Sequence, residues 1–169
     1  KAVYSHPEAG HVMQHQDREV EASYYDIDPE TGLELRVRPD LVIPCMGARL
    51  GFDLKSISMF DVKENQLKER IRSEIIKRDY HLSAAMYCDV AQLDQFFWVF
   101  VNKDEHYHWV VVVEATAELL ELGREELRYS LNKIAHGYDF GEWPAPIVED
   151  YQQGLTDFDK KRLAYLRSL

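Results

Sequence analysis

The sequence has no long uninterrupted apolar segment. Its longest apolar runs, Phe96–Val101 and Trp109–Val113, are far too short to cross a bilayer. Residues 1–7 contain no apolar region of the kind that a signal peptide needs. We therefore expect no membrane association. The first residue is Lys1 and not Met, which is compatible with a chain that lacks an upstream N-terminal segment.

The sequence has few cysteines and no excess of basic residues. Two cysteines, Cys45 and Cys88, cannot build a disulfide framework or ligate an iron–sulfur cluster, and they suit a reducing cytoplasm, where we expect the protein to work. The 20 Lys and Arg residues against 30 Asp and Glu residues give a net charge of −10. This balance argues against a sequence-independent coat for nucleic acid. It is compatible with a nuclease, because the active site of a nuclease is itself acidic in order to hold metal.

The pattern of apolar residues predicts one domain, over residues 1–169, with a mixed α/β fold. Residues 2–16 favour helix weakly, and alternation predicts a meander of three antiparallel strands over Arg18–Tyr25, Leu33–Ile43 and Arg49–Ile57. The period then changes to that of a helix, and later stretches alternate again. We expect helices over 61–77, from Asp79 as N-cap to Leu93, from Thr116 as N-cap to a stop at Gly137, and over 156–168, with two strands over Phe96–Asn102 and Tyr107–Ala115.

The residues with the clearest chemical potential lie on two neighbouring predicted strands. Asp40 ends one strand, and Asp53 and Lys55 are two residues apart on the next, so both point to one side while Leu54 points to the core. Two carboxylates that a hairpin brings together are unfavourable unless a cation neutralises them. A hard cation such as Mg²⁺ prefers such oxygens, and a nearby lysine can orient a water or stabilise charge on a phosphate. A third acid, Glu21, lies on the polar face of the preceding strand.

An Asp-x-Lys triplet alone is common on exposed strands, but the wider pattern resembles a known family. Pro39-Asp40…Asp53-Leu54-Lys55 looks like the PD-(D/E)xK nuclease motif. Over about residues 18–145 the order and spacing of short motifs resemble the C-terminal nuclease domain of RecE-type exonucleases (exonuclease VIII): Glu19-Val20-Glu21-Ala22-Ser23-Tyr24, Glu30-Thr31-Gly32, Arg36-Val37-Arg38-Pro39-Asp40, Ile43-Pro44, Asp53-Leu54-Lys55-Ser56, Tyr80-His81, Ala85-Met86-Tyr87 and Glu142-Trp143-Pro144.

This resemblance implies a restriction-endonuclease-like mixed sheet of about five strands flanked by helices. It implies a Mg²⁺-dependent 5′→3′ exonuclease on linear double-stranded DNA, with Mn²⁺ able to substitute, used by phages and prophages for recombination with a single-strand annealing protein. By the same resemblance Asp40, Asp53 and the backbone carbonyl of Leu54 bind metal, Lys55 is the catalytic lysine, and Glu21 binds metal through water.

The resemblance also assigns substrate contacts, with two departures. Tyr87 matches the tyrosine of the family's Gln-x-x-x-Tyr motif, but the glutamine position is Ser83, whose side chain reaches less far. The family's upstream histidine is not matched by the histidines near the N-terminus: His6, His11 and His15.

Weaker candidates for contacts to DNA lie after the predicted site. His81 either contacts DNA or is a hydrogen-bonded, partly buried histidine. A second set is seven residues apart, and either follows a phosphate backbone or forms a solvated helix face balanced by acids: Lys63, Arg70 and Lys77.

Three functions remain open at this point. The first is the exonuclease. A net charge of −10 opposes tight DNA binding by a lone domain, and the resemblance to exonucleases that enclose DNA in rings implies a homo-oligomeric ring, a trimer or tetramer. The second is a structure-specific or restriction-like endonuclease on the same fold. The third is a catalytically decayed DNA-processing scaffold, a class that the retention of Asp40, Asp53 and Lys55 disfavours.

Overall fold

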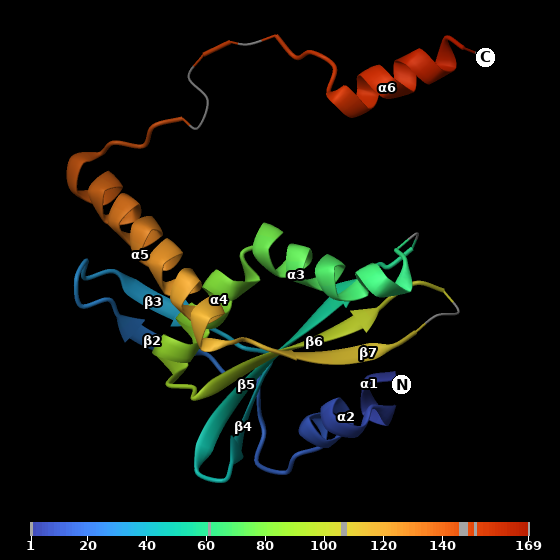
Figure 1. The fold of residues 1–169 in the computed structure, drawn as a ribbon. Coiled ribbons are helices and arrows are strands. Elements are labelled where there is room, and N and C mark those ends of the chain that lie inside the picture. The colour runs from blue at the N-terminus through green and yellow to red at the C-terminus, as the bar shows by residue number, and fades with distance from the viewer. Residues whose placement is uncertain (1, 61, 106–107, 146–148, 151, 169) are drawn as a thin grey trace.

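The fold is built on one mixed five-stranded sheet (Figure 1). A computed structural model describes residues 2–60, 62–105, 108–145, 149–150 and 152–168. The strand order is β1-β4-β5-β6-β7, with β5 and β6 parallel and the other neighbours antiparallel. This architecture confirms the predicted mixed sheet of about five strands flanked by helices. Among the described residues, no helix combines the length and the apolar composition that crossing a membrane requires.

The first part of the chain forms two hairpins and not the predicted single meander. The strands are β1 (Glu19–Val20), β2 (Tyr24–Ile27), β3 (Glu34–Val37), β4 (Leu41–Cys45) and β5 (Ala48–Ile57). Strands β2 and β3 pair in a separate two-stranded sheet, so the predicted strands over Arg18–Tyr25 and Leu33–Ile43 each break in the middle.

Two local features explain these breaks. Glu21 adopts a positive φ of 48°, which no extended strand tolerates. Pro39 lacks an N–H and cannot donate to a sheet ladder, so the chain leaves one sheet and enters the other there. The break places Asp40 at the junction, immediately before β4.

Two helices connect the parallel strands. After β5 come a 3₁₀ turn η1 (Glu64–Gln66), α3 (Leu67–Lys77) and α4 (Tyr80–Ala91), and the chain returns as β6 (Gln95–Asn102) and β7 (Val110–Glu114). The helix predicted over 61–77 therefore starts later, and Tyr107 of the predicted last strand lies outside the described residues. Asp79 precedes α4 as predicted, but its φ is 52° and its side chain makes no capping hydrogen bond.

The long helix α5 (Ala117–Phe140) begins as predicted and ends later. The Thr116 side chain accepts a hydrogen bond from the Leu119 N–H, which confirms the predicted cap. The helix runs through Gly137 to Gly141, whose φ of 69° suits a helix end. Gly137 serves packing instead, since a Cβ there would lie 2.6 Å from the Trp143 ring.

The sheet buries both of its faces. On one face α3, α4 and the start of α5 pack over the side chains of Phe96, Trp98 and Phe100. On the other face α1 (Ala2–Ser5) and α2 (Pro7–Met13) cover a smaller cluster around Phe52 and Val99. The terminal helix α6 (Asp157–Leu166) lies apart from this body (Figure 1) and has no buried residue.

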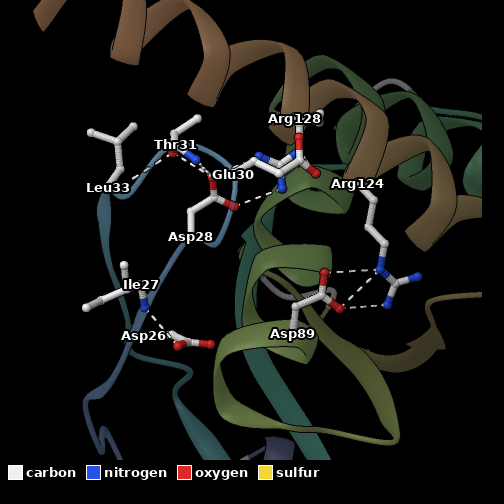
Figure 2. Close-up of polar contacts among 9 residues, drawn as sticks. All are labelled: Asp26, Ile27, Asp28, Glu30, Thr31, Leu33, Asp89, Arg124 and Arg128. Carbon is white, nitrogen blue, oxygen red and sulfur yellow. Dashed lines mark hydrogen bonds and ion pairs between the residues drawn. The ribbon is translucent and has the colours of Figure 1, made fainter. Parts of the chain in front are cut away.

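Two arginines of α5 fasten the β2–β3 hairpin and α4 to that helix, as Figure 2 shows. Arg128 donates to both carboxylate oxygens of the buried Asp28, each at 2.8 Å. Arg124 donates to both oxygens of Asp89 on α4, at 2.9 to 3.1 Å. Hydrogen bonds from Arg128 hold the pKa of Asp28 well below its usual range. These contacts fix the hairpin that leads into Asp40.

Candidate active site

The hairpin of β4 and β5 brings the two predicted aspartates together. Leu41 pairs with Phe52, so Asp40 and Asp53 occupy the next opposed position. The Asp40 carboxylate accepts a hydrogen bond of 2.7 Å from the Leu54 N–H, which fixes it against β5. The Glu21 N–H donates to the Asp40 carbonyl oxygen at 3.0 Å, so both the side chain and the carbonyl group of Asp40 are held.

Asp53 and Lys55 form an ion pair on the face of β5 that α4 covers. Their Nζ and Oδ2 atoms are in direct contact, which confirms that the two side chains share one side of the strand. Asp53 is 6% exposed, and Lys55 is half-buried. Leu54, by contrast, is 38% exposed, so the prediction that it points to the core is wrong.

The electrostatics of this pair are unbalanced toward negative charge. Burial raises the pKa of Asp53 to about 6, and the neighbouring Asp40 carboxylate acts in the same direction. Lys55 opposes both effects without cancelling them. A bound divalent cation would remove this imbalance, because Asp40, Asp53 and the Leu54 carbonyl offer the hard oxygen ligands that Mg²⁺ prefers. The donor set therefore fits such an ion.

Helix α4 supplies an aromatic wall beside Lys55. The Lys55 Nζ lies 4.6 Å from the centre of the Tyr80 ring, a cation–π contact that steadies the ammonium group. Burial raises the pKa of Tyr87, and the Asp53 carboxylate raises it further. The Ser83 hydroxyl donates to the Asp79 carbonyl on its own helix at 3.3 Å. Tyr80 lies on the same helical face as Tyr87. The motif spacing assigned no role to Tyr80, although its ring is the one that contacts Lys55.

Of the remaining predicted residues, Glu21 does not join the two aspartates as a third close ligand, and His81 takes a structural place. Within the described ranges, Glu21, Asp40 and Asp53 do not gather three ligand oxygens within 4.8 Å of one another. His81 is 1% exposed, with Nε2 at 2.7 Å from Glu126, so the predicted contact to DNA is wrong and the hydrogen-bonded alternative holds. The fold instead brings Asp79, His81 and Glu126 within 4.8 Å, through the packing of α4 on α5.

The three basic residues at seven-residue spacing do not share one helix face. Lys63 lies before the 3₁₀ turn, so the helical repeat does not reach it. Arg70 donates to the buried Glu74 at 2.7 Å, which also accepts from Arg78. Lys77 is exposed at the end of α3. The predicted row along a phosphate backbone is therefore wrong as a geometric unit.

Comparisons with known proteins give a fold and no family. No family model matches the chain, and no curated protein matches it either. Among solved structures, the crystal structure of a "putative exonuclease" from Eubacterium rectale matches 89% of this chain and 59% of that chain, at 12% identity and a TM-score of 0.58. The crystal structure of SSO0001 matches 74% of this chain and 54% of that chain, at 12% identity and a TM-score of 0.43.

The first of these matches defines the fold class. The chain has the mixed α/β fold of the Eubacterium rectale protein, with a five-stranded mixed sheet flanked by helices. The chain spans just over half the length of both matched structures.

Proposed function

We propose that this protein is a metal-dependent nuclease that hydrolyses the phosphodiester bonds of DNA. The observation that carries the proposal is the meeting of Asp40, Asp53 and Lys55 at one point of the sheet, where a buried carboxylate faces a second carboxylate and a lysine. The fold shared with the Eubacterium rectale protein supports the same class. A structural ion pair would need only one of the two acids.

The proposed site holds Mg²⁺, or Mn²⁺ in its place, between Asp40, Asp53 and the backbone carbonyl of Leu54. When bound, such an ion supplies Lewis-acid stabilisation of the negative charge on the scissile phosphate. Asp40 is held for this role by the Leu54 N–H. The Glu21 backbone is hydrogen-bonded to the Asp40 carbonyl oxygen. In this proposal the Glu21 side chain contributes to metal binding at most through a water.

Lys55 acts in this proposal as a charged donor and not as a base. Burial acts to lower the pKa of Lys55, but the Asp53 carboxylate outweighs it and raises the pKa above the usual value. The side chain is therefore an ammonium at neutral pH. It donates to a phosphate oxygen or orients the attacking water, and it stabilises charge that develops in the transition state. The Tyr80 ring, which the ammonium group contacts, limits where this group points.

The finer proposal is an exonuclease on linear double-stranded DNA, with 5′→3′ polarity and a role in phage or prophage recombination. A homo-oligomeric ring belongs to this proposal, because a chain of net charge −10 holds DNA better by enclosing it than by basic contacts. Its partner would be a single-strand annealing protein. Support for this level comes from the motif resemblance.

The test is digestion of end-labelled linear duplex DNA and of closed circular DNA, each with Mg²⁺, with Mn²⁺ and with EDTA. We expect cation-dependent loss of the linear substrate alone. Asp40→Asn and Lys55→Met should each lower the rate by about 100-fold or more. The matched controls are Asp26→Asn and Lys103→Met, which change exposed residues of the same types.

Each other outcome replaces the proposal with a defined alternative. Cleavage of the circle would identify an endonuclease. Lack of cleavage of either substrate with both cations would leave a non-catalytic scaffold. Equal activity of Lys55→Met and the parent would show that Lys55 only neutralises Asp53.

A further inference from the structure

A groove with an apolar floor lies on the same face of the sheet as the acid pair, and its β7 side is two strands away from Asp53. It has a volume of about 890 Å³ and runs between α3, the edge strand β7 and the start of α5. Ile71 and Ile75 of α3, Val111 and Val113 of β7 and Leu119 of α5 form its floor. These side chains belong to the main core or pack against it, so the groove is a fixed feature of the fold.

The two rims of the groove carry opposite charges. Lys68 and Arg72 of α3 line one side, and Glu114 and Glu118 line the other. All four are exposed. A segment with an apolar face and flanking charges of both signs would match this surface.

The C-terminal helix α6 has those properties. Phe158 is 73% exposed, and Tyr165 and Leu166 follow it at seven and eight residues, so the three side chains lie on one face of the helix. Arg162 lies within that stripe, and Asp159 lies in the first turn. A capping box at the start of α6 makes the helix locally stable, although none of the residues of α6 is buried.

We propose that α6 of one molecule docks into the α3–β7–α5 groove of a second copy of this chain. Phe158, Tyr165 and Leu166 would meet the apolar floor. Arg162 would face the acidic rim of Glu114 and Glu118. The helix has 10 residues, a length of about 15 Å, which is close to the length of the 11-residue helix α3 on one side of the groove.

The path of the chain allows α6 to reach a partner copy. Residues 141–156 join α5 to α6, enough chain to reach about 50 Å when extended. Within one molecule α6 stands away from the molecule's own groove (Figure 1). The charges also favour this contact, because α6 bears three basic residues against two acidic ones, an excess of one positive charge, whereas the whole chain carries a net charge of −10.

The test uses two full-length variants that each damage one side of the contact. Phe158→Asp damages the helix and leaves the groove intact. Leu122→Asp damages the groove, where Leu122 is 44% exposed, and leaves the helix intact. Ala164→Asp on the opposite face of α6 and Ile134→Asp on α5, at 39% exposure and outside the groove, are the matched controls.

Light scattering at micromolar concentration should show that the parent and both controls self-associate. Each damaging variant should associate at least about tenfold more weakly, with an unchanged thermal midpoint. An equimolar mixture of the two variants should recover association, because an intact helix then meets an intact groove in another molecule. A monomeric parent, association that survives Phe158→Asp, or a mixture that stays monomeric would each overturn the proposal. The first of these results would be the one expected if α6 docked within its own chain.

Discussion

Replacement of Asp53 by asparagine should stabilise the folded protein while it removes the proposed activity. Burial and the Asp40 carboxylate raise the pKa of Asp53 from 3.8 to about 6 even with Lys55 beside it. A difference of about 2 pH units corresponds to about 3 kcal/mol of unfavourable free energy for the charged form in the folded state. Asparagine keeps the shape of the side chain and removes that charge.

The pH dependence gives the sign of the effect. Because the pKa of Asp53 is raised in the folded state, the folded protein binds the proton more tightly than the unfolded chain does. The destabilisation is therefore absent below about pH 4, grows through the interval up to about pH 6 and is fully present above it. Asp53→Asn should be more stable than the parent by about 2–3 kcal/mol at neutral pH and equal to it in acid.

Thermal unfolding in EDTA at about pH 7.5 and about pH 4 measures this difference. The expected rise in melting temperature at the higher pH is roughly 4–12 °C for a chain of this size. Added Mg²⁺ should stabilise the parent and leave the variant unchanged, because a ligand stabilises only a protein that binds it. If Asp53→Asn unfolds at a lower temperature than the parent at neutral pH without a cation, the ion pair with Lys55 outweighs burial, and the site is not poised for a metal.

Two further changes test the scaffold around the site. Asp28→Asn should lower stability by about 2–3 kcal/mol at neutral pH, because it leaves Arg128 without its buried charge partner; exposed Asp26→Asn is the control. Since the pKa of Asp28 is depressed, its contribution exists above about pH 4 and should fade as the pH falls toward the folded-state value, which denaturant unfolding across pH will measure. Gly123→Ala should lower stability by about 2–3 kcal/mol, because its Cβ would lie 2.4 Å from a carbonyl oxygen of α4; Gly154→Ala, with open space around it, should change nothing. An unchanged Gly123→Ala would show that α4 and α5 can separate freely.

Local sequence determined the central part of the candidate site. Side chains two apart on a strand share a face whatever surrounds them, so Asp53 and Lys55 had to meet on one side of β5. The tight turn at Met46 and Gly47 fixes the register of β4 against β5, and that register sets Asp40 opposite Asp53. Local signals also located the Thr116 cap correctly.

Tertiary structure decided which residues near these acids are accessible. The sequence over residues 79–81 does not distinguish a histidine that contacts substrate from a buried one. His81 is buried because Gly123 lets α5 approach α4 so closely that Glu126 forms a hydrogen bond with the His81 ring. Arg70 is engaged by Glu74, which the packing of α3 buries. The two hairpins separate at Glu21 and Pro39 because β1 and β4 join the main sheet while β2 and β3 pack on α4 and, through Asp28, on α5. Periodicity along the chain specifies which side chains share a face, but the partner that covers the face comes from distant segments, and burial then determines which side chains remain available to a substrate.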